Sequence, residues 1–255
     1  MPCTKPKKPE FVFEQTQEAA EENFRVLQRY DNNLEQAIQA QKNSPLGYGS
    51  EFRPTEILEY IFRRHPLWPE MKLTLSRGSD WPLDDLPSEE CKNDLEEALI
   101  FGNHKGATAK PLLLCELIAQ DVMHGYCLPL PLSKIGKIPG ALLAPMNIMA
   151  QSTINETGKI IEKDRLTHDQ SFKWASGTSI NSRVDFDQLT PCRFGHCLKR
   201  IVNWAVAARY KFPQGRILAT KFDFKSAYRR LHISSNIAVQ SCTQLPEENQ
   251  AYVML

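Results

Sequence analysis

The sequence lacks the features that would place it in a membrane or in a secretory pathway. It has no uninterrupted run of about 18 apolar residues, which argues against a membrane-spanning helix. Its first nine residues hold three lysines and three prolines but no apolar segment, so they do not resemble a signal peptide. We therefore expect an intracellular protein, cytoplasmic or nuclear, with no membrane partner.

A disulfide framework and a zinc finger are also poorly supported. The seven cysteines are odd in number and widely scattered in a chain without an export signal, so we expect reduced thiols. Cys192, His196 and Cys197 lie close together, which suggests zinc as a weaker alternative. Because no second ligand pair follows at zinc-finger spacing, we assign no zinc site.

The chain has little net charge, but its halves differ. The net charge is +1 in total. Residues 1–150 hold 16 Lys and Arg against 21 Asp and Glu, or −5, whereas residues 151–255 hold 15 against 9, or +6. The basic second half would suit a polyanionic partner.

Helical patterns dominate the first half. Residues 1–13 are predicted to be a disordered basic tail, followed by a helical leader region of unknown role over residues 14–140. The leader region is expected to contain one long amphipathic helix over 14–41 and shorter ones over 55–64, 88–101 and 110–124. Residues 101–107 have two glycines and a lysine but do not match the phosphate-cradling loop motif, so they are expected to be a plain loop, and Leu128–Leu132 is expected to run extended over the surface.

Strand patterns begin near residue 141. Two β-prone runs, 147–154 and 159–168, flank the turn sequence 155–158 and predict a hairpin. Its second arm carries Lys159, Lys163 and Arg165, which would suit a phosphate chain, although a solvated basic face is the ordinary alternative. A helix over 194–209, with its apolar side buried, and strands over 217–224, 238–243 and 251–255 should follow. Because the last strand pattern has no terminating turn, we expect the chain to be a fragment.

Asp223 stands at the end of the predicted strand 217–224. The residues of this strand alternate, so that one face is apolar or Thr and the other ends in the carboxylate of Asp223. An unpaired buried carboxylate is costly, which favours metal or substrate binding. The alternative is an aspartate that only caps the next turn.

The second half resembles the front part of a reverse transcriptase domain of retrotransposon type. The likeness rests on Lys163–Phe172, on Gly177–Asn181 and above all on Lys221–Ile233, with its Asp-x-x-x-Ala-Tyr motif. In such RNA-directed DNA polymerases the first two segments belong to the fingers and the third is the first motif of the palm. The implied fold class is α+β, a helical N-terminal region followed over residues 141–255 by a partial palm and fingers.

The resemblance also implies roles for single residues. Asp223, with the backbone carbonyl of Phe224, would hold Mg²⁺ for two-metal nucleotidyl transfer. Tyr228 would lie under the sugar ring and exclude a 2′-hydroxyl, which distinguishes deoxynucleotides from ribonucleotides. Arg165 would contact the triphosphate of the incoming deoxynucleotide, and Lys159 would be a second phosphate contact. The expected partners are an RNA template, an RNA–DNA duplex, deoxynucleoside triphosphates and the remainder of the polymerase domain.

One departure from the family decides the expected activity. The later Tyr-x-Asp-Asp hairpin, which supplies the other catalytic carboxylates, is missing from the sequence. We therefore predict a reverse transcriptase-like chain that is inactive alone. The alternative is a non-catalytic nucleic-acid-binding or assembly module derived from a retroelement. A fragment of an RNA-directed RNA polymerase is a third possibility, against which Tyr228 argues.

Overall fold

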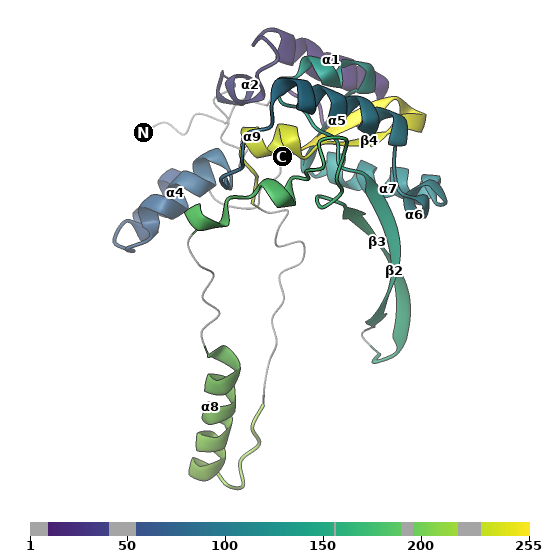
Figure 1. Cartoon of the computed structure of the whole chain (residues 1–255). Coiled ribbons are helices and arrows are strands. Elements are labelled where there is room, and N and C mark those ends of the chain that lie inside the picture. Colours follow the sequence, from purple (N-terminus) through teal and green to yellow (C-terminus); the bar gives the residue numbers. More distant parts are fainter. Residues whose placement is uncertain (1–9, 41–54, 156, 190–195, 219–230) are drawn as a thin grey trace.

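The computed structural model describes residues 10–40, 55–155, 157–189, 196–218 and 231–255 (Figure 1). Helices and strands are mixed, which confirms the α+β class at that level. The helices are α1 (Gln17–Gln28), α2 (Leu34–Ala40), α3 (Thr55–Phe62), α4 (Trp68–Arg77), α5 (Ser88–Phe101), α6 (Lys105–Thr108), α7 (Pro111–Met123), α8 (Cys197–Lys211) and α9 (Ser235–Gln240). Across those ranges, no helix combines the length and apolar character needed to span a bilayer.

Two antiparallel sheets organise the chain. The first has the strand order β1 (Cys127–Pro131), β5 (Gln250–Met254) and β4 (Thr243–Leu245). The second is a hairpin of β2 (Met146–Ile154) and β3 (Ile160–His168), which projects from the rest of the structure as a curved arm (Figure 1). The predicted hairpin and the predicted last strand are therefore confirmed.

The predicted surface path of residues 128–132 is wrong. Cys127–Pro131 is a fully buried strand that pairs with β5. Pro129 and Pro131 are compatible with pairing because β1 is an edge strand, and residues two apart direct their backbone nitrogens to the same side. The missing N–H groups therefore fall on the unpaired side of the strand.

The single helix predicted over residues 14–41 is also wrong, because the chain turns between α1 and α2. Asp31 and Asn32 have positive φ angles of 53° and 60°, a conformation that Asp and Asn tolerate better than most residues. Asn33 then starts α2, since its side-chain oxygen accepts a hydrogen bond from the backbone N–H of Gln36 at 2.9 Å. The prediction failed because the apolar residues keep their helical spacing across Asp31–Asn33, the three polar residues at which the helix breaks.

A third wrong prediction concerns residues 238–243, which were expected to form a strand. They continue α9 to Gln240 and pair as β4 only from Thr243. Ser234 is the N-cap of α9, and its hydroxyl accepts from the backbone N–H of Ile237. This capping signal outweighs the β-propensity of the buried residues Ile237 and Val239.

The hydrophobic core joins the two ends of the chain. Its main cluster includes Leu27 from α1, Leu130 from β1 and Val253 from β5, all with no measurable exposure. The buried side chain of Asn23 connects them further, because its amide donates to the carbonyl of Pro129 and exchanges two hydrogen bonds with the backbone of Val12. The core therefore contains residues from both sides of position 140, near which the sequence pattern changes from helical to stranded.

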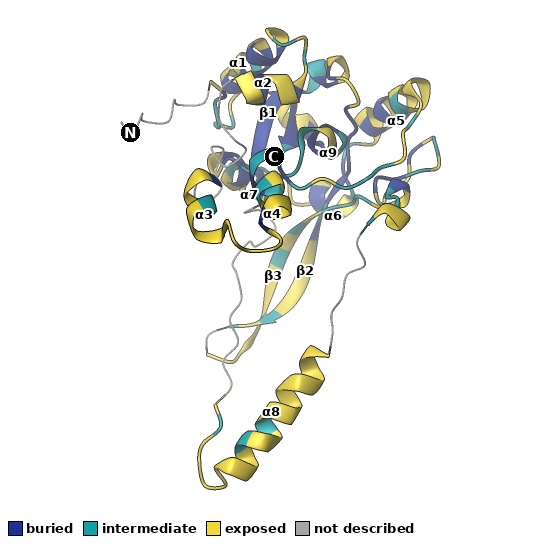
Figure 2. Ribbon diagram, turned by 90° about the vertical axis from the view of Figure 1, so that its left-hand side faces the viewer, coloured by how far each residue is buried: buried dark blue, intermediate teal, exposed yellow. Residues whose placement is uncertain are grey.

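Helix α8 differs from its prediction in burial rather than in position. It spans Cys197–Lys211, close to the predicted range, but none of its residues is buried, and Figure 2 shows it apart from the other elements. Leu198, Ile201 and Val202 were expected on a buried side and are 75%, 62% and 51% exposed. Within the described ranges nothing covers this apolar side.

This arrangement predicts that residues 141–255 do not fold alone. Without residues 1–140, β5 loses its partner β1 and the core loses α1. Only β4 and β5 then remain of the first sheet, and a two-stranded sheet is too small to bury its apolar face. The isolated polypeptide 141–255 should show no cooperative thermal unfolding by circular dichroism, whereas the full chain should. A cooperative transition in the isolated polypeptide would contradict this view of the core.

Candidate nucleic-acid interface

The predicted site residues fall into two groups. Asp223, Phe224 and Tyr228 lie outside the described residues, so the structure gives no geometry for the expected Mg²⁺ site or sugar contact. Lys159 and Arg165 belong to the β2–β3 hairpin and are exposed. The site that can be built from the structure is therefore the hairpin.

The tip of the hairpin is formed by a side-chain-supported turn. The Asn155 side-chain oxygen accepts hydrogen bonds from the backbone N–H groups of Thr157 and Lys159 at 3.0 and 2.9 Å, and from the Thr157 hydroxyl at 2.8 Å. Gly158 has a φ of +79°, the left-handed conformation expected for it from the sequence. These contacts fix the backbone of Lys159 at the tip.

The strand register separates the charges of the hairpin by sign. Alternate residues of β3 point to opposite faces, so Lys163 and Arg165 share one face, while Glu162 and Asp164 share the other. The partners of the two cations across the ladder are Gln151 and Met149, which share their face and are uncharged. One face of the arm, here called the cationic face, therefore carries Lys163 and Arg165 without an acid.

The opposite face attaches the hairpin to the rest of the protein. Ile148 and Leu166 are opposite one another on this face and pack in the second core cluster, with Met146 fully buried beside them. Farther along, Lys110 pairs with Asp164 at 2.7 and 2.8 Å from its two oxygens. The cationic face is left exposed because the acidic face is the one that packs.

Lys159 and Arg165 do not share one phosphate group. Five residue steps separate Ile160 from Arg165, which corresponds to roughly 17 Å along a strand. Arg165 lies toward the root of the arm and Lys159 at its tip. The two cations therefore suit separate phosphate groups of an extended polyanion, and Lys163 lies between them along β3.

The two segments that resemble fingers motifs meet at the root of the hairpin. Asp169 follows β3, and its carboxylate accepts from the backbone N–H of Ser171 and lies 3.1 Å from Nε2 of His104. Asn181 donates its side-chain amide to the Ser171 hydroxyl at 2.8 Å and its backbone N–H to Gln170. The segments 163–172 and 177–181, assigned from sequence to one region, are thus in direct contact.

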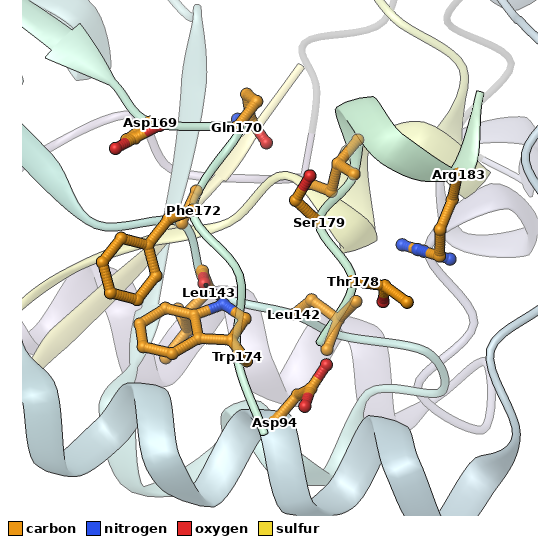
Figure 3. A pocket seen from close by; sticks show the side chains of 12 residues that line it. Asp94, Leu142, Leu143, Asp169, Gln170, Phe172, Trp174, Thr178, Ser179 and Arg183 are labelled. Atoms are coloured by element: carbon orange, nitrogen blue, oxygen red, sulfur yellow. Dashed lines mark hydrogen bonds between the residues drawn. The ribbon is translucent and has the colours of Figure 1, made fainter. Parts of the chain in front are cut away.

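A pocket beside these segments is too small for a nucleotide. It lies between α5 and residues 169–183 (Figure 3), with a cavity volume of about 10 Å³, enough for about one water molecule. Around it, Asp94 of α5 accepts two hydrogen bonds from Ser176, and the Trp174 indole donates to the carbonyl of Leu143. These contacts fix the loop of residues 169–183 against α5.

Sequence reasoning missed the residues that hold the hairpin. Asn103, His104 and Lys110 lie in or beside the segment expected to be a plain loop, yet each contacts the hairpin or the residue directly after it. No local pattern marks them, because their partners are 43 to 65 residues away in the sequence. Of these pairs, Lys110 and Asp164 have opposite formal charges, which could have suggested from the sequence that they are in contact.

Comparison with known proteins adds no assignment. No protein-family model matches the chain, and neither the curated proteins nor the solved structures contain a significant match. In the part of the chain that the structure describes, no three His, Cys, Asp or Glu side chains come together as metal ligands would. The hairpin geometry and the sequence resemblance are therefore the basis for a function.

Because of two histidines, we expect the free energy of unfolding to fall in acid. Burial lowers the pKa of His168 and of His232 to about 4, and no hydrogen-bond partner for either ring nitrogen of His168 or for Nε2 of His232 is found among the described residues. The unfolded chain binds protons near pH 6.5, so the free energy of unfolding should fall between pH 6.5 and 4, by about 3 kcal/mol for each histidine. Above pH 6.5 both states are neutral and this contribution is constant.

Urea unfolding at pH 7 and pH 4.5 measures this effect. His168→Phe removes the titrating group, so it should reduce the difference in unfolding free energy between the two pH values. The exposed Phe186 provides a control, because it carries no titrating group and Phe186→Leu should leave the difference unchanged. Equal pH dependence in the wild type and in His168→Phe would show that His168 is not held neutral.

Proposed function

We propose that the chain binds the sugar-phosphate backbone of a nucleic acid along the cationic face of the β2–β3 hairpin, as the fingers part of a reverse transcriptase-type polymerase. The observation that supports the proposal is the separation of charge on the arm. Lys163 and Arg165 share the exposed face, and both acids of β3 lie on the other. A track of cations on a projecting strand suits a polyanion that is recognised by charge and shape.

The resemblance supplies the rest of this proposal. An RNA template and an RNA–DNA duplex are the proposed polyanions. Arg165, nearest the root, is proposed to contact the triphosphate of a deoxynucleotide when one is bound and the backbone of the duplex otherwise. Asp223 and Phe224 are proposed Mg²⁺ ligands and Tyr228 a sugar contact, on the sequence motif alone. Because the sequence has no Tyr-x-Asp-Asp motif, we propose that this polypeptide does not polymerise without the remainder of a polymerase domain.

A binding module without catalysis is the second candidate. It is favoured by the same missing motif, together with a cationic face that needs no catalytic residue to hold nucleic acid. Both candidates require the hairpin to bind nucleic acid, and they differ in whether Asp223 has a catalytic role.

Substitution of both cations tests the binding function. Lys163→Ala/Arg165→Ala should lower the affinity for an RNA–DNA duplex roughly tenfold and reduce the slope of log K against log salt by about 2, because two phosphate contacts are lost. Fluorescence anisotropy at several salt concentrations measures both quantities. Lys92→Ala, an exposed lysine on α5, is the control for loss of charge alone. If the double variant and the control bind alike, the hairpin is not the binding surface.

A primer-extension assay separates the two candidates. With Mg²⁺, a primed RNA template and deoxynucleotides, the chain alone should give no product. Adding the remainder of a related polymerase domain as a separate polypeptide should restore synthesis, and Asp223→Ala should abolish it, if the chain is a polymerase part. Synthesis by the chain alone would contradict the proposed dependence, and no restoration by any such complement would favour the binding module.

A further inference from the structure

We infer that the segment Asn103–Lys110 of the helical leader region is a positioning element, which sets the direction in which the β2–β3 hairpin presents its cationic face. This inference rests on the proposed function of the hairpin and gives a role to a part of the chain that has none from its sequence.

The root of the hairpin is fixed through Met146, the first residue of β2. The backbone N–H of Met146 donates to the side-chain oxygen of Asn103 at 2.8 Å, and its carbonyl accepts from the backbone N–H of His104 at 3.0 Å. The amide nitrogen of Asn103 donates to the carbonyl of Gln244 in β4 at 2.8 Å. One buried amide, 8% exposed, thus joins the hairpin to the three-stranded sheet.

The next contact is a close approach of backbones at Gly106. A Cβ atom at this position would come within 2.6 Å of the carbonyl oxygen of Ile148 and closer still to the side-chain oxygen of Asn147. Real Cβ atoms do not approach backbone oxygen so closely, and the carbonyl of Ile148 belongs to the strand itself. Any side chain at position 106 must therefore displace the root of β2.

The outermost contact is the ion pair between Lys110 and Asp164, on the side of β3 opposite the cationic face. Asp164 stands between Lys163 and Arg165 in sequence. The ion pair therefore holds β3 in place from the face opposite the two proposed phosphate-binding residues. Beyond it the arm has little support, since most of β2 after Ile148 is exposed. The direction of the arm is set at its root and by this pair.

Small changes at the root are amplified at the tip. Eight residue steps lead from Met146 to Ile154, or roughly 27 Å, so that a tilt of about 10° at the root moves the tip by about 5 Å. Such a movement changes which phosphates the cations reach without removing any cation. A positioning residue should therefore alter affinity while leaving the salt dependence of binding in place.

The chain offers matched controls. Gly106→Ala should tilt the hairpin, whereas Gly136→Ala adds the same methyl group at a position where its Cβ would come no nearer than 3.6 Å to another atom, in the side chain of Leu95. Lys110→Gln removes the pair with Asp164, whereas Lys105→Gln removes the same charge from an exposed lysine for which the described residues show no ion pair. The Lys110 variant lies on the surface and should fold even if Gly106→Ala does not.

The experiment measures two quantities for the wild type and the four variants: affinity for an RNA–DNA duplex at several salt concentrations, and hydrogen exchange of the backbone amides of β2 and β3 against those of β1 and β5. Gly106→Ala should weaken binding at least fivefold and Lys110→Gln two- to fivefold, with an unchanged salt slope and faster exchange in the hairpin. Gly136→Ala and Lys105→Gln should leave hairpin exchange and affinity close to wild type.

The outcomes separate this inference from the proposed function. If Gly106→Ala and Lys110→Gln match their controls in hairpin exchange, the segment does not position the hairpin, whatever the binding result. If hairpin exchange changes as expected but the wild type does not bind the duplex, the proposed function fails and the structural role of the segment stands without a binding function to serve. Changed exchange together with unchanged affinity would also overturn the positioning role in binding.

Discussion

The hydrogen bonds of the Asn103 side chain are the interaction on which the candidate site most depends. The side-chain oxygen of Asn103 accepts a hydrogen bond from the N–H of Met146, the first residue of the hairpin, and its amide nitrogen donates to the three-stranded sheet. It therefore fixes the position of the hairpin relative to this sheet, although the two sheets share no strand. It is buried, where an unsatisfied partner would cost more free energy than in water. An amide that satisfies a donor and an acceptor at once restricts the hairpin root to a narrow range of positions.

The charge arrangement of the arm follows from this attachment. Because side chains alternate along a strand, packing Met146, Ile148 and Leu166 against the core determines the face of every later residue. Asp164 then meets Lys110, and Arg165 and Lys163 face outward. A register shift of one residue would reverse this arrangement and turn the cations toward the protein. The binding surface is therefore a consequence of core packing at the root.

Prediction from sequence succeeded where the signals were local. The end of α7 follows from Gly125 and the tip of the hairpin from an Asn-x-x-Gly turn, and the structure places both within two residues of the expected positions. Helix α5 also begins at the expected residue, Ser88, although no side-chain capping hydrogen bond starts it. The break at Asp31–Asn33, the helix after Ser234 and the burial of β1 were missed, because the apolar pattern is compatible with either outcome. The roles of Asn103, Gly106 and Lys110 could not be predicted, since they depend on contacts with distant residues. Asp223, the centre of the sequence argument, lies outside the described residues and stays a prediction.

The reactivity of the lysines in the presence of nucleic acid tests the central claim most directly. Acetylation rates of individual lysines can be measured by mass spectrometry with and without an RNA–DNA duplex. If the cationic face of the hairpin binds the backbone, the duplex should protect Lys163 and Lys159 while Lys92 and Lys137, on other elements, react as before. Unchanged reactivity of Lys163 in the bound complex, or protection confined to the lysines of α8, would contradict the account.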